Sequence, residues 1–470
     1  MPPSRKTIAS PTGTRDMYPP ELSRRRWIEQ RWRAAAIRHG FDEIDGPTFE
    51  HTELYTLKSG DGIVSEIFGV FSGKDEAAVK ELGQRLASGE NAPAPFALRP
   101  EFTPTLARMY AARAGQLPKP TRWFWQQTCF RAERPQRGRL REFMQWNCDI
   151  IGTPAEPADA AAYAESLAAQ DVDAIAACVG LMEDVGLTPE MVKVRLSSRA
   201  VLGSIIRALG VSPENESSAF VLLDRRDRLD DADLEAMAFE FGIHEAGFLA
   251  FLKRPRGKRG MEEALSFLEP AAAEGVVAPL RRLLTLLEQA GLSAWCEVDL
   301  NIARGLAYYT GMVFEVHETS GAMRAIAGGG RYDNLIETFG GPPTPAVGFG
   351  MGDVVLSLVL SDRGLMPDDR AIAGELGLRP DAFVISNGTP ESDSALTGLV
   401  TRLRAARLHA RRSSKATKNI GKLLKDASDC GARFAVIIES ASEATLKNLD
   451  ANTQERVGLA DVPAKIAGAR

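Results

Sequence analysis

The sequence of 470 residues lacks the marks of several protein classes. It contains no run of roughly 18–20 apolar residues, the length that a membrane helix needs, and its start, MPPSRKTIASPTGTRD, has no apolar core of a secretory signal. Its five cysteines are scattered without a CxxC pair, and its five histidines show no HExxH-like spacing. We therefore predict neither a disulfide framework nor a metal site, and we expect a reducing, cytoplasmic location without membrane contact.

Two common nucleotide-binding motifs are also missing. No GxxxxGK[ST] loop occurs, so a P-loop site is not expected, and GFGMG at 348–352 is too loose a match to the dinucleotide motif GxGxxG. The net charge is −5, from 57 basic and 62 acidic residues. Any contact with nucleic acid must therefore be local rather than spread over the whole surface.

The order of predicted elements indicates more than one domain. Hydrophobic residues make up 44% and charged residues 25% of the chain, as in globular proteins, and the length favours two or three domains. Periodicity predicts an amphipathic helix over about 20–39 and then a strand broken near Pro47. The other elements expected before residue 366 are a polar insertion compatible with a helix (76–94), a strand, turn and helix (96–110), two long antiparallel strands within 122–151, a helix (157–187), a strand (192–198), a helical module (about 200–275), strands at SAWCEVDL and MVFEVHE, and a Gly-rich turn, AGGGRYDN, before another helix.

After a loop near 366–378 the pattern changes. The strand AFVIS, a helix over 391–407, a short strand, a helix over 418–429 and the strand RFAVIIE follow one another. Such alternation indicates a small, separate α/β domain. Within it, residues 402–425 hold nine Lys or Arg and no acidic residue, which favours a polyanionic partner over an ordinary solvated helix face.

The stretch FRAERPQRGRLREF (130–143), between the two long strands, carries five arginines and two glutamates. Two glutamates cannot neutralise five arginines, so a bound polyphosphate explains the stretch better than an internal Arg–Glu network. Residues two apart in a strand share a face. Arg131 and Glu133 therefore face the same way. The outgoing strand has one polar face (Phe143, Gln145, Asn147, Asp149) and one apolar face for the core (Met144, Trp146, Cys148, Ile150).

Several motifs resemble one family. FRAERPQRGRLREF is similar to motif 2 of the class II aminoacyl-tRNA synthetases, in the form found in histidyl-tRNA synthetase. ARGLAYYTGMVFE (303–315) and AGGGRYDNL (327–335) resemble two segments of the histidine branch. ALRPEFTPTLAR (97–108) and GTRD (13–16) resemble further family signatures, and the C-terminal α/β domain resembles the family's anticodon-binding domain.

The resemblance implies a fold and an activity. The expected fold is α+β: a class II core, an antiparallel sheet flanked by helices, in 1–199 and 276–373, a helical insertion in 200–275, and an anticodon-binding-like α/β domain in 374–470. The implied activity is that of a histidine–tRNA ligase, which activates L-histidine with ATP to histidyl-adenylate and transfers it to the 3′ end of tRNA(His). Mg²⁺ would be bound through the ATP phosphates. A homodimer is expected, because the first helix and the Pro47 strand resemble motif 1, which forms the subunit interface.

The resemblance also assigns roles to the residues that match the motifs. Arg131 would hold the α-phosphate and the substrate carboxylate, and Arg304 would be the second catalytic arginine. Glu133 would contact adenine, Arg139 the outer phosphates, and Phe143 would stack on adenine.

Histidine and tRNA have their own implied sets. The residues implied to bind histidine, besides Arg131 and Arg304, are Glu101 and Thr103 for the α-amino group and Gln145, Asp149, Tyr308 and Tyr309 around the side chain. Because Tyr308 and Tyr309 are adjacent, we expect them to face opposite ways, with at least one able to serve the core. The residues implied to contact tRNA are Gln136, Arg411, Arg412, Lys415 and Lys418.

Three positions depart from the family pattern. Ala307 replaces an Asp within RGLDYYTG, and Phe102 replaces a Gly in LRPEGT, so that turn differs or does not demand Gly. Motif 3 has Val354 and Val355 where Glu and an ATP-binding Arg are expected. We expect a weakened but working ATP site, with Arg331 as a candidate replacement.

Two alternatives stay open at this point. One is a catalytically silent relative such as the regulatory subunit of ATP phosphoribosyltransferase. The other is a synthetase-like protein that binds histidine or tRNA only as a sensor.

Overall fold

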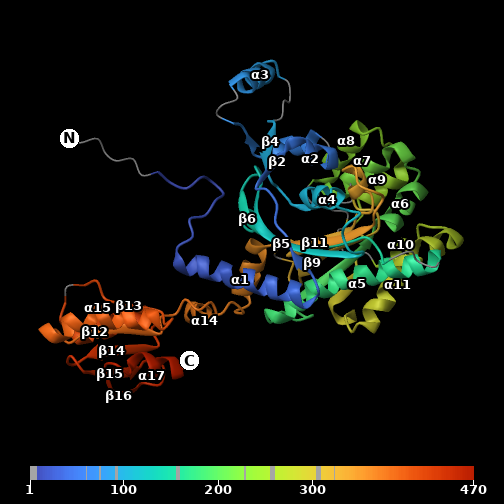
Figure 1. Ribbon diagram of the computed structural model, residues 1–470. Coiled ribbons are helices and arrows are strands. Elements are labelled where there is room, and N and C mark those ends of the chain that lie inside the picture. The colour runs from blue at the N-terminus through green and yellow to red at the C-terminus, as the bar shows by residue number, and fades with distance from the viewer. Residues whose placement is uncertain are drawn as a thin grey trace. The chain divides into compact units, whose positions relative to one another are not determined.

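The computed structural model describes residues 8–59, 61–72, 76–89, 94–154, 159–226, 229–254, 260–302, 308–321, 323–415 and 417–469 (Figure 1). Contacts divide the chain into two units. The larger consists of Ile28–Met366 with the residues before Met17, and the smaller of Met17–Trp27 with Pro367–Arg470. Within the described ranges, no helix combines the length and apolar character needed to cross a membrane. The domain boundaries at 199, 275 and 373 stay predictions.

The larger unit is built on an eight-stranded sheet, as predicted for the class II core. Every neighbouring pair is antiparallel except the pair at each edge, where β1 runs parallel to β5 and β8 parallel to β7. The strands, in spatial order, are β1 (Asp42–Glu43), β5 (Thr121–Phe130), β6 (Glu142–Ile151), β11 (Ala346–Gly352), β10 (Ala327–Arg331), β9 (Met312–Glu318), β7 (Val192–Ser198) and β8 (Cys296–Val298). A separate small sheet has the order β2 (Phe49–His51), β4 (Phe96–Leu98), β3 (Gly69–Val70).

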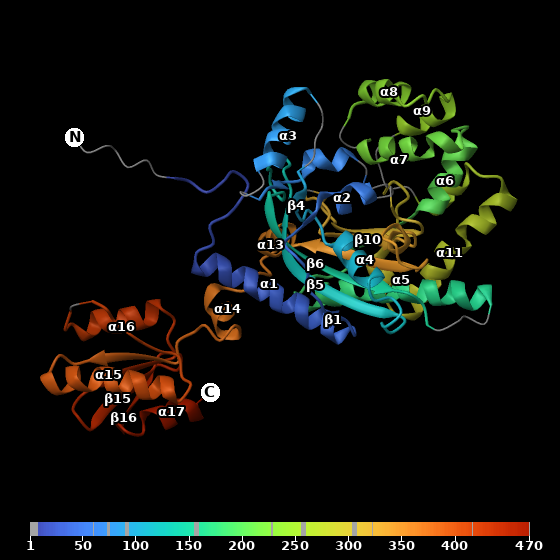
Figure 2. The ribbon, with the colours of Figure 1, turned by 45° about the horizontal axis from the view of Figure 1, so that its top comes forward.

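Helices surround this sheet (Figure 2). α5 packs on β6 and β11, and α11 packs on α5. The predicted end of the helical insertion at 275 falls inside α11, whose buried Val277, Leu280, Leu283 and Leu287 form one stripe at helical spacing. The helices of this part of the chain are α1 (Pro19–Arg38), α2 (Thr52–Ser59), α3 (Glu76–Ala87), α4 (Thr103–Ala111), α5 (Ala160–Asp184), α6 (Arg199–Ala208), α7 (Glu216–Arg225), α8 (Asp231–Glu240), α9 (Ala246–Leu252), α10 (Met261–Leu265), α11 (Pro270–Gln289), α12 (Leu335–Thr338) and α13 (Asp353–Asp362).

The two central strands β5 and β6 form the predicted long hairpin. Residues Thr121–Phe130 pair in continuous antiparallel register with Glu142–Ile151. The apolar face of β6 is buried, and the Trp146 ring lies 6.1 Å from the Trp32 ring of α1 in a stacked arrangement. The indole N–H of Trp32 donates to the sulfur of Met351 at 3.3 Å. The core therefore covers one side of the hairpin and leaves the other side for polar groups.

The Gly-rich stretch AGGGR is a strand, β10, and the prediction of a turn there was wrong. β10 pairs with β9 on one side and β11 on the other. A Cβ at Gly329 would lie 2.4 Å from the carbonyl oxygen of Gly348 and 2.5 Å from Cβ of Phe349. The glycine is thus required by close packing between neighbouring strands and not by a turn.

Phe102 shows why its position does not demand glycine. Its φ is −109°, which any residue adopts, and it precedes α4 as the N-cap. Its ring is fully buried, with the centroid 4.5 Å from that of Trp125. The turn of the LRPEFT segment is therefore filled by an aromatic side chain that adds to the core.

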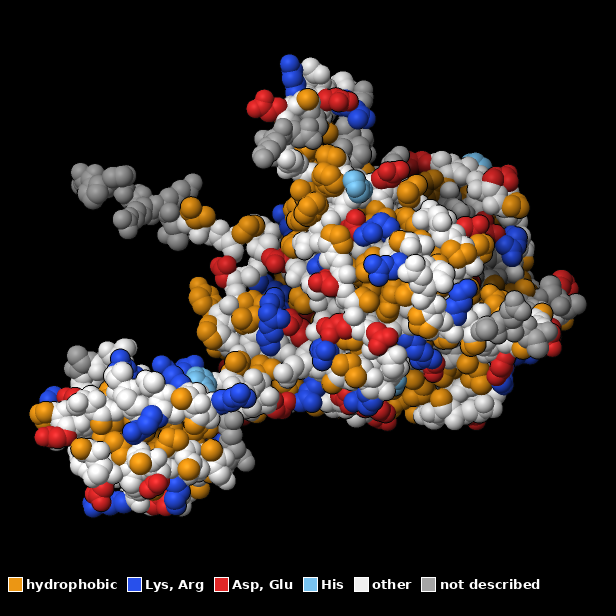
Figure 3. All heavy atoms as spheres, in the orientation of Figure 1, with side chains coloured by type: hydrophobic (Ala, Val, Ile, Leu, Met, Phe, Trp, Pro, Cys, Tyr) orange, Lys and Arg blue, Asp and Glu red, His pale blue; other side chains and the backbone are white. Residues whose placement is uncertain are grey.

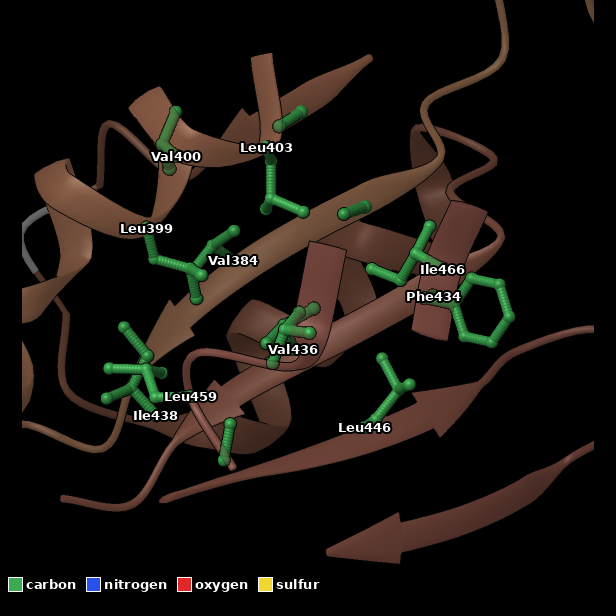
Figure 4. Packing of buried hydrophobic residues seen from close by; sticks show 14 of the residues in the cluster. Val384, Leu399, Val400, Leu403, Phe434, Val436, Ile438, Leu446, Leu459 and Ile466 are labelled. Carbon is green, nitrogen blue, oxygen red and sulfur yellow. The ribbon is translucent and has the colours of Figure 1, made fainter. Parts of the chain in front are cut away.

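The smaller unit contains the predicted α/β domain. Its sheet has the order β13-β12-β14-β15-β16, parallel in the first three strands and antiparallel after them. Figure 4 shows residues of β12, β14, β15, α15 and α17 meeting in one buried cluster. Its elements are α14 (Asp369–Glu375), β12 (Ala382–Ser386), α15 (Pro390–Ala405), β13 (Ala410–Arg412), α16 (Ile420–Asp429), β14 (Phe434–Ile438), β15 (Glu443–Asn448), β16 (Thr453–Gly458) and α17 (Val462–Gly468).

Candidate active site

Two pockets meet on the polar side of the β5–β6 hairpin. The larger pocket, about 260 Å³, is lined chiefly by the Arg-rich hairpin, the start of β10 and the start of α13. The smaller pocket, about 130 Å³, is lined by β6, β11, the start of α4 and the tyrosines at 308, 309 and 332. Arg131, Gln145, Gly328 and Gly350 line both pockets. Two ligands bound in the two pockets would therefore touch beside Arg131.

The larger pocket carries the predicted nucleotide residues. Arg131, Glu133, Arg139 and Phe143 all line it. Arg139 forms an ion pair with Glu133 at 2.5 Å, so part of the charge is balanced within the protein. The Arg131 guanidinium lies 5.2 Å from the centre of the Phe143 ring. The Glu133 Oε2 atom is buried and has no hydrogen-bond partner in the described part of the chain. A ligand N–H could fill that acceptor.

The smaller pocket is built around a buried carboxyl group. Asp149 is 1% exposed, and the Tyr332 hydroxyl donates a hydrogen bond of 2.6 Å to its Oδ1. Burial raises the pKa of Asp149 to about 7, while the hydrogen bond from Tyr332 and the charge of Lys58 oppose the rise. Asp149 Oδ2 and Asn147 Oδ1 are buried acceptors that lack a partner among the described residues. The pocket thus offers oxygen acceptors to a ligand that brings N–H groups.

Both adjacent tyrosines line this pocket, so the expectation that they face opposite ways was wrong. Tyr308 and Tyr309 precede β9 in irregular backbone, where the alternation of a strand does not apply. Their ring centroids lie 4.2 Å apart. Burial raises the pKa of both phenols, which keeps them neutral at physiological pH.

A buried lysine that sequence reasoning had no grounds to select lies behind Glu101, which lines the pocket. Lys58, on α2, places Nζ 2.6 Å from Oε2 of Glu101 and 3.9 Å from the centre of the Tyr308 ring. Its side chain is only 2% exposed. Glu101 and Thr103, whose role in histidine binding stays a prediction, both line the pocket, and Lys58 orients the Glu101 carboxylate from behind.

Glycines on β11 make room for these polar side chains. A Cβ at Gly348 would lie 2.0 Å from Oδ1 of Asp149, and a Cβ at Gly350 would lie 2.4 Å from Nε2 of Gln145. Real Cβ atoms do not approach other atoms so closely. The glycines of GFGMG, a stretch that fits no dinucleotide motif, therefore leave room for the polar side chains that line the pockets.

The N-terminal GTRD segment fastens the Arg-rich loop. The Arg15 guanidinium pairs with the Asp353 carboxylate at 2.7 Å, and the same carboxylate accepts the backbone N–H of Met144 at 2.9 Å. The backbone N–H of Arg141 donates to the carbonyl of Gly13 at 2.8 Å. These bonds tie the loop to the start of α13 and hold the outgoing strand in place.

The two valines of motif 3 lie on the wall of the larger pocket. Val355 is 8% exposed, and its side chain lies against the loop near Gly138. Arg331 does not replace the missing arginine, contrary to our prediction. Its guanidinium is buried and bonded to Asp171 at 2.6 Å and Asp333 at 3.3 Å, and it lines neither pocket.

Arg304 and Ala307 lie outside the described residues, so the role of Arg304 stays a prediction. Gln136 is exposed in the Arg-rich loop and forms a backbone bridge with Arg139. Within the ranges that the structure describes, no group of three or more His, Cys, Asp or Glu could hold a metal ion.

The basic segment 402–425 belongs to the smaller unit. Arg411 and Arg412 are exposed on β13 and bond to His409 and Thr397. The Lys415 ammonium pairs with Asp426 at 2.5 Å, and Lys418 donates to the carbonyl of Gly388 at 2.8 Å. Lys415 and Lys418 also line a polar hollow at the carboxyl end of β12, together with Ser386, Asp393, Ser413 and Thr417.

Sequence reasoning missed several polar residues: Tyr332, Arg324 and Glu315 line the pockets, and Lys58 lies next to one of them. Tyr332 follows the Gly-rich stretch AGGGR, so a signal existed for it, since that stretch was singled out as a family motif. Lys58 and Arg324 carry no signal of their own, because they reach the site only through the packing of α2 and the register of β10.

The sequence and the structure of the chain are similar to those of known proteins. The family profile described as histidyl-tRNA synthetase matches residues 13–352. A histidine–tRNA ligase of Opitutus terrae is 36% identical over 92% of this chain and 90% of its own length. One of Halobacterium salinarum is 33% identical over 96% of each chain. The crystal structure of histidyl-tRNA synthetase from Nostoc sp. PCC 7120 has a similar fold, with a TM-score of 0.72 and 22% identity over 99% of this chain and 100% of that one.

Replacing Asp149 with Asn tests the buried carboxyl group. Its pKa is higher in the folded protein than the ordinary value of 3.8, so the folded state binds the extra proton, and the contribution of this group to wild-type stability falls as pH rises from about 4 to about 7. The amide side chain of the variant does not titrate, so burying it carries no such pH-dependent cost in stability. We expect Asp149→Asn to gain stability relative to wild type over this range, by at most about 1.4 kcal/mol per pH unit, and to gain nothing more above about pH 8.

Thermal unfolding of both proteins at about pH 4.5, 6 and 8 measures the effect. A stability difference that stays constant across these pH values would contradict the assignment of a raised pKa to Asp149.

Proposed function

The chain belongs to the histidyl-tRNA synthetase family, and from this premise we propose that its two pockets carry out the two halves of histidine activation. In this proposal ATP occupies the larger pocket, L-histidine occupies the smaller one, and histidyl-adenylate forms where they meet. The histidyl group then passes to the 3′ end of tRNA(His). The observation that carries the proposal is that Arg131 and Gln145 line both pockets.

Charge and shape support ATP in the larger pocket. Arg131 and Arg139 offer guanidinium groups that match phosphate oxygens bidentately. Phe143 offers a ring face on which adenine stacks, and the unpartnered Oε2 of Glu133 accepts a hydrogen bond from the exocyclic amine of adenine. Arg139 changes partner from Glu133 toward the outer phosphates as ATP enters.

The smaller pocket suits the amino acid. Glu101 receives the α-ammonium group, and Asp149 accepts the imidazole N–H through its open Oδ2. An amino acid without that N–H leaves a buried carboxyl oxygen unpaired. Sites built to hydrogen-bond a substrate reject such analogues by factors of about 10⁴–10⁵. Tyr332 holds the carboxyl group in the orientation that this selection needs.

Activation joins two anions, and the chain lowers the barrier by placing positive charge between them. A histidine carboxylate oxygen attacks the α-phosphorus, a new P–O bond forms, and the bond to the pyrophosphate leaving group breaks. Arg131, at the junction, holds the carboxylate and the α-phosphate together and stabilises the charge that develops on the phosphorus oxygens. Arg304 is proposed to act as the second such arginine.

Magnesium ions fit the larger pocket as companions of ATP. The carboxylate of Glu315 on its wall is a hard oxygen ligand of the kind that Mg²⁺ accepts beside phosphate oxygens and water. When bound, Mg²⁺ neutralises part of the phosphate charge. No dedicated protein cage is needed for this role.

The smaller unit is proposed to bind tRNA through its basic segment. Arg411, Arg412, Lys415 and Lys418 are exposed, and the last two edge a polar hollow that can receive a phosphate or a base. Gln136, exposed in the Arg-rich loop of the other unit, is proposed to contact the tRNA end that accepts histidine.

We further propose that the chain works as a homodimer. Large apolar side chains are exposed around the small sheet, where Phe49, Leu57 and Phe71 are 51%, 54% and 38% exposed. Figure 3 shows hydrophobic side chains gathered in this area. A self-complementary interface would cover them. Sedimentation that finds a stable monomer at micromolar concentration would contradict this.

The silent alternatives receive no support from the comparisons. The curated relatives are histidine–tRNA ligases, and they match the chain over 92% and 96% of its length, including the basic C-terminal unit. Arg131 and Arg139 of the Arg-rich hairpin line a pocket next to the one proposed to bind histidine. A protein that only senses histidine does not need a second pocket with arginines beside the histidine pocket.

Substitution of the two catalytic arginines tests the proposed reaction. Arg131→Ala and Arg304→Ala should each slow histidine-dependent ATP–pyrophosphate exchange by about 10²–10³-fold, the usual effect of removing a preorganised charge stabiliser. Arg137→Ala is the matched control, because Arg137 lies in the same loop, pairs with Asp362 and lines neither pocket. Undetectable exchange in wild-type protein that binds histidine normally would favour the sensor.

The basic segment is tested separately. Replacing Arg411, Arg412, Lys415 and Lys418 with Gln should weaken tRNA binding and flatten its dependence on salt, because each lost phosphate contact removes about one released counterion. Filter binding of tRNA(His) at several salt concentrations measures both effects. Exchange without tRNA should be unchanged. An equal fall in exchange would show that the segment is structural.

A further inference from the structure

The larger pocket contains an arginine that none of the family motifs assigns. At the position where the motif 3 arginine is expected, Val355 presents an apolar side chain to the pocket wall. Arg324, in the segment before β10, lines the same pocket. It is half-buried, which sets it apart from the exposed arginines of the Arg-rich loop such as Arg137.

The sheet register brings Arg324 to the place that motif 3 leaves apolar. β10 and β11 are antiparallel, with Ala327 opposite Met351 and Gly328 opposite Gly350. The chain that precedes β10 therefore runs beside the chain that follows β11, which is the start of α13. The backbone N–H of Ile326 donates to the carbonyl of Val316 at 2.7 Å and fixes this segment to β9. Arg324 and Val355 thus reach one wall of the pocket from two different elements.

The balance of acidic and basic side chains in the larger pocket indicates a role for Arg324. Its described lining holds three arginines, at 131, 139 and 324, and two glutamates, at 133 and 315. Glu133 pairs with Arg139, and Glu315 bonds to His317 at 2.7 Å. Among the described lining residues, the acidic and basic side chains would balance without Arg324, and this part of the pocket would offer a polyphosphate no net positive charge. With Arg324 it carries one positive charge in excess.

We propose that Arg324 contacts the ATP phosphates and supplies the cation that Val355 does not. This inference rests on the proposed function, because it takes ATP as the ligand of the larger pocket. A guanidinium on the segment before β10 reaches the phosphates from a different element than the one that carries Arg139, and its planar fork pairs with two phosphate oxygens. The site thereby keeps the number of cations that the family pattern provides while taking one of them from a different element.

Direct ATP binding and steady-state exchange test the proposal together. Arg324→Ala should weaken ATP binding and raise KM for ATP by roughly 10- to 150-fold, the range expected for one charge-assisted contact. Histidine affinity, measured by calorimetry without ATP, should be unchanged. Arg324→Lys should retain part of the ATP affinity, because it keeps the charge and loses the fork. Arg137→Ala serves again as the control.

A second substitution separates a role in ATP binding from a role in folding. In the Arg324→Ala background, Val355→Arg should restore at least part of the lost ATP affinity, since it returns a cation to the same wall. In the wild-type background the same substitution should change ATP affinity less. This difference identifies the two positions as alternatives for one task.

The outcomes distinguish the inference from the function on which it rests. Wild-type protein that binds no ATP at millimolar concentration would defeat the proposed function. Wild-type protein that binds ATP, with an Arg324→Ala variant of the same affinity within about twofold, would overturn only the role of Arg324. Loss of histidine binding together with ATP binding in Arg324→Ala would also overturn it, because that pattern means a structural role.

Discussion

The site depends on the close approach of β11 to the polar side chains of β6. At Gly348 a Cβ would lie 2.0 Å from the Asp149 carboxyl group, and at Gly350 it would lie 2.4 Å from the Gln145 amide. The absence of side chains there lets polar groups lie flat on the sheet and leaves space above them. On the opposite face, Trp146 stacks on Trp32 and anchors the same strand. β6 can therefore serve the core with one face and the site with the other, because the neighbouring strand β11 carries glycine at the positions next to the polar side chains.

The charged side chains then distinguish the two pockets that lie in this space. The larger pocket gathers guanidinium groups, and the smaller gathers acidic groups and phenols around a buried carboxyl group. Arg131 lies at the boundary and is shared by both. Buried Lys58 holds Glu101 in place on one side, and Asp353 ties Arg15 to the Arg-rich loop on the other. These ion pairs fix the orientation of charged groups around the two pockets.

Sequence reasoning succeeded where local periodicity decides the structure. The alternation along 143–150 predicted which side chains of β6 enter the site, and the hairpin and the C-terminal α/β domain were read correctly. It failed where distant segments decide. AGGGR is a strand because it pairs with β9 and β11, and Arg331 is held by Asp171, 160 positions away. Tyr308 and Tyr309 share a pocket because their backbone is irregular, which period-two reasoning cannot detect.

The central claim is that one ligand can span both pockets through Arg131. Calorimetry with a non-reactive histidyl-adenylate analogue tests it most directly. The account predicts that the analogue binds once per chain, more tightly than histidine or ATP alone, and that an excess of either substrate displaces it. Binding that only one of the two substrates displaces, or that is no tighter than that of histidine alone, would contradict the account.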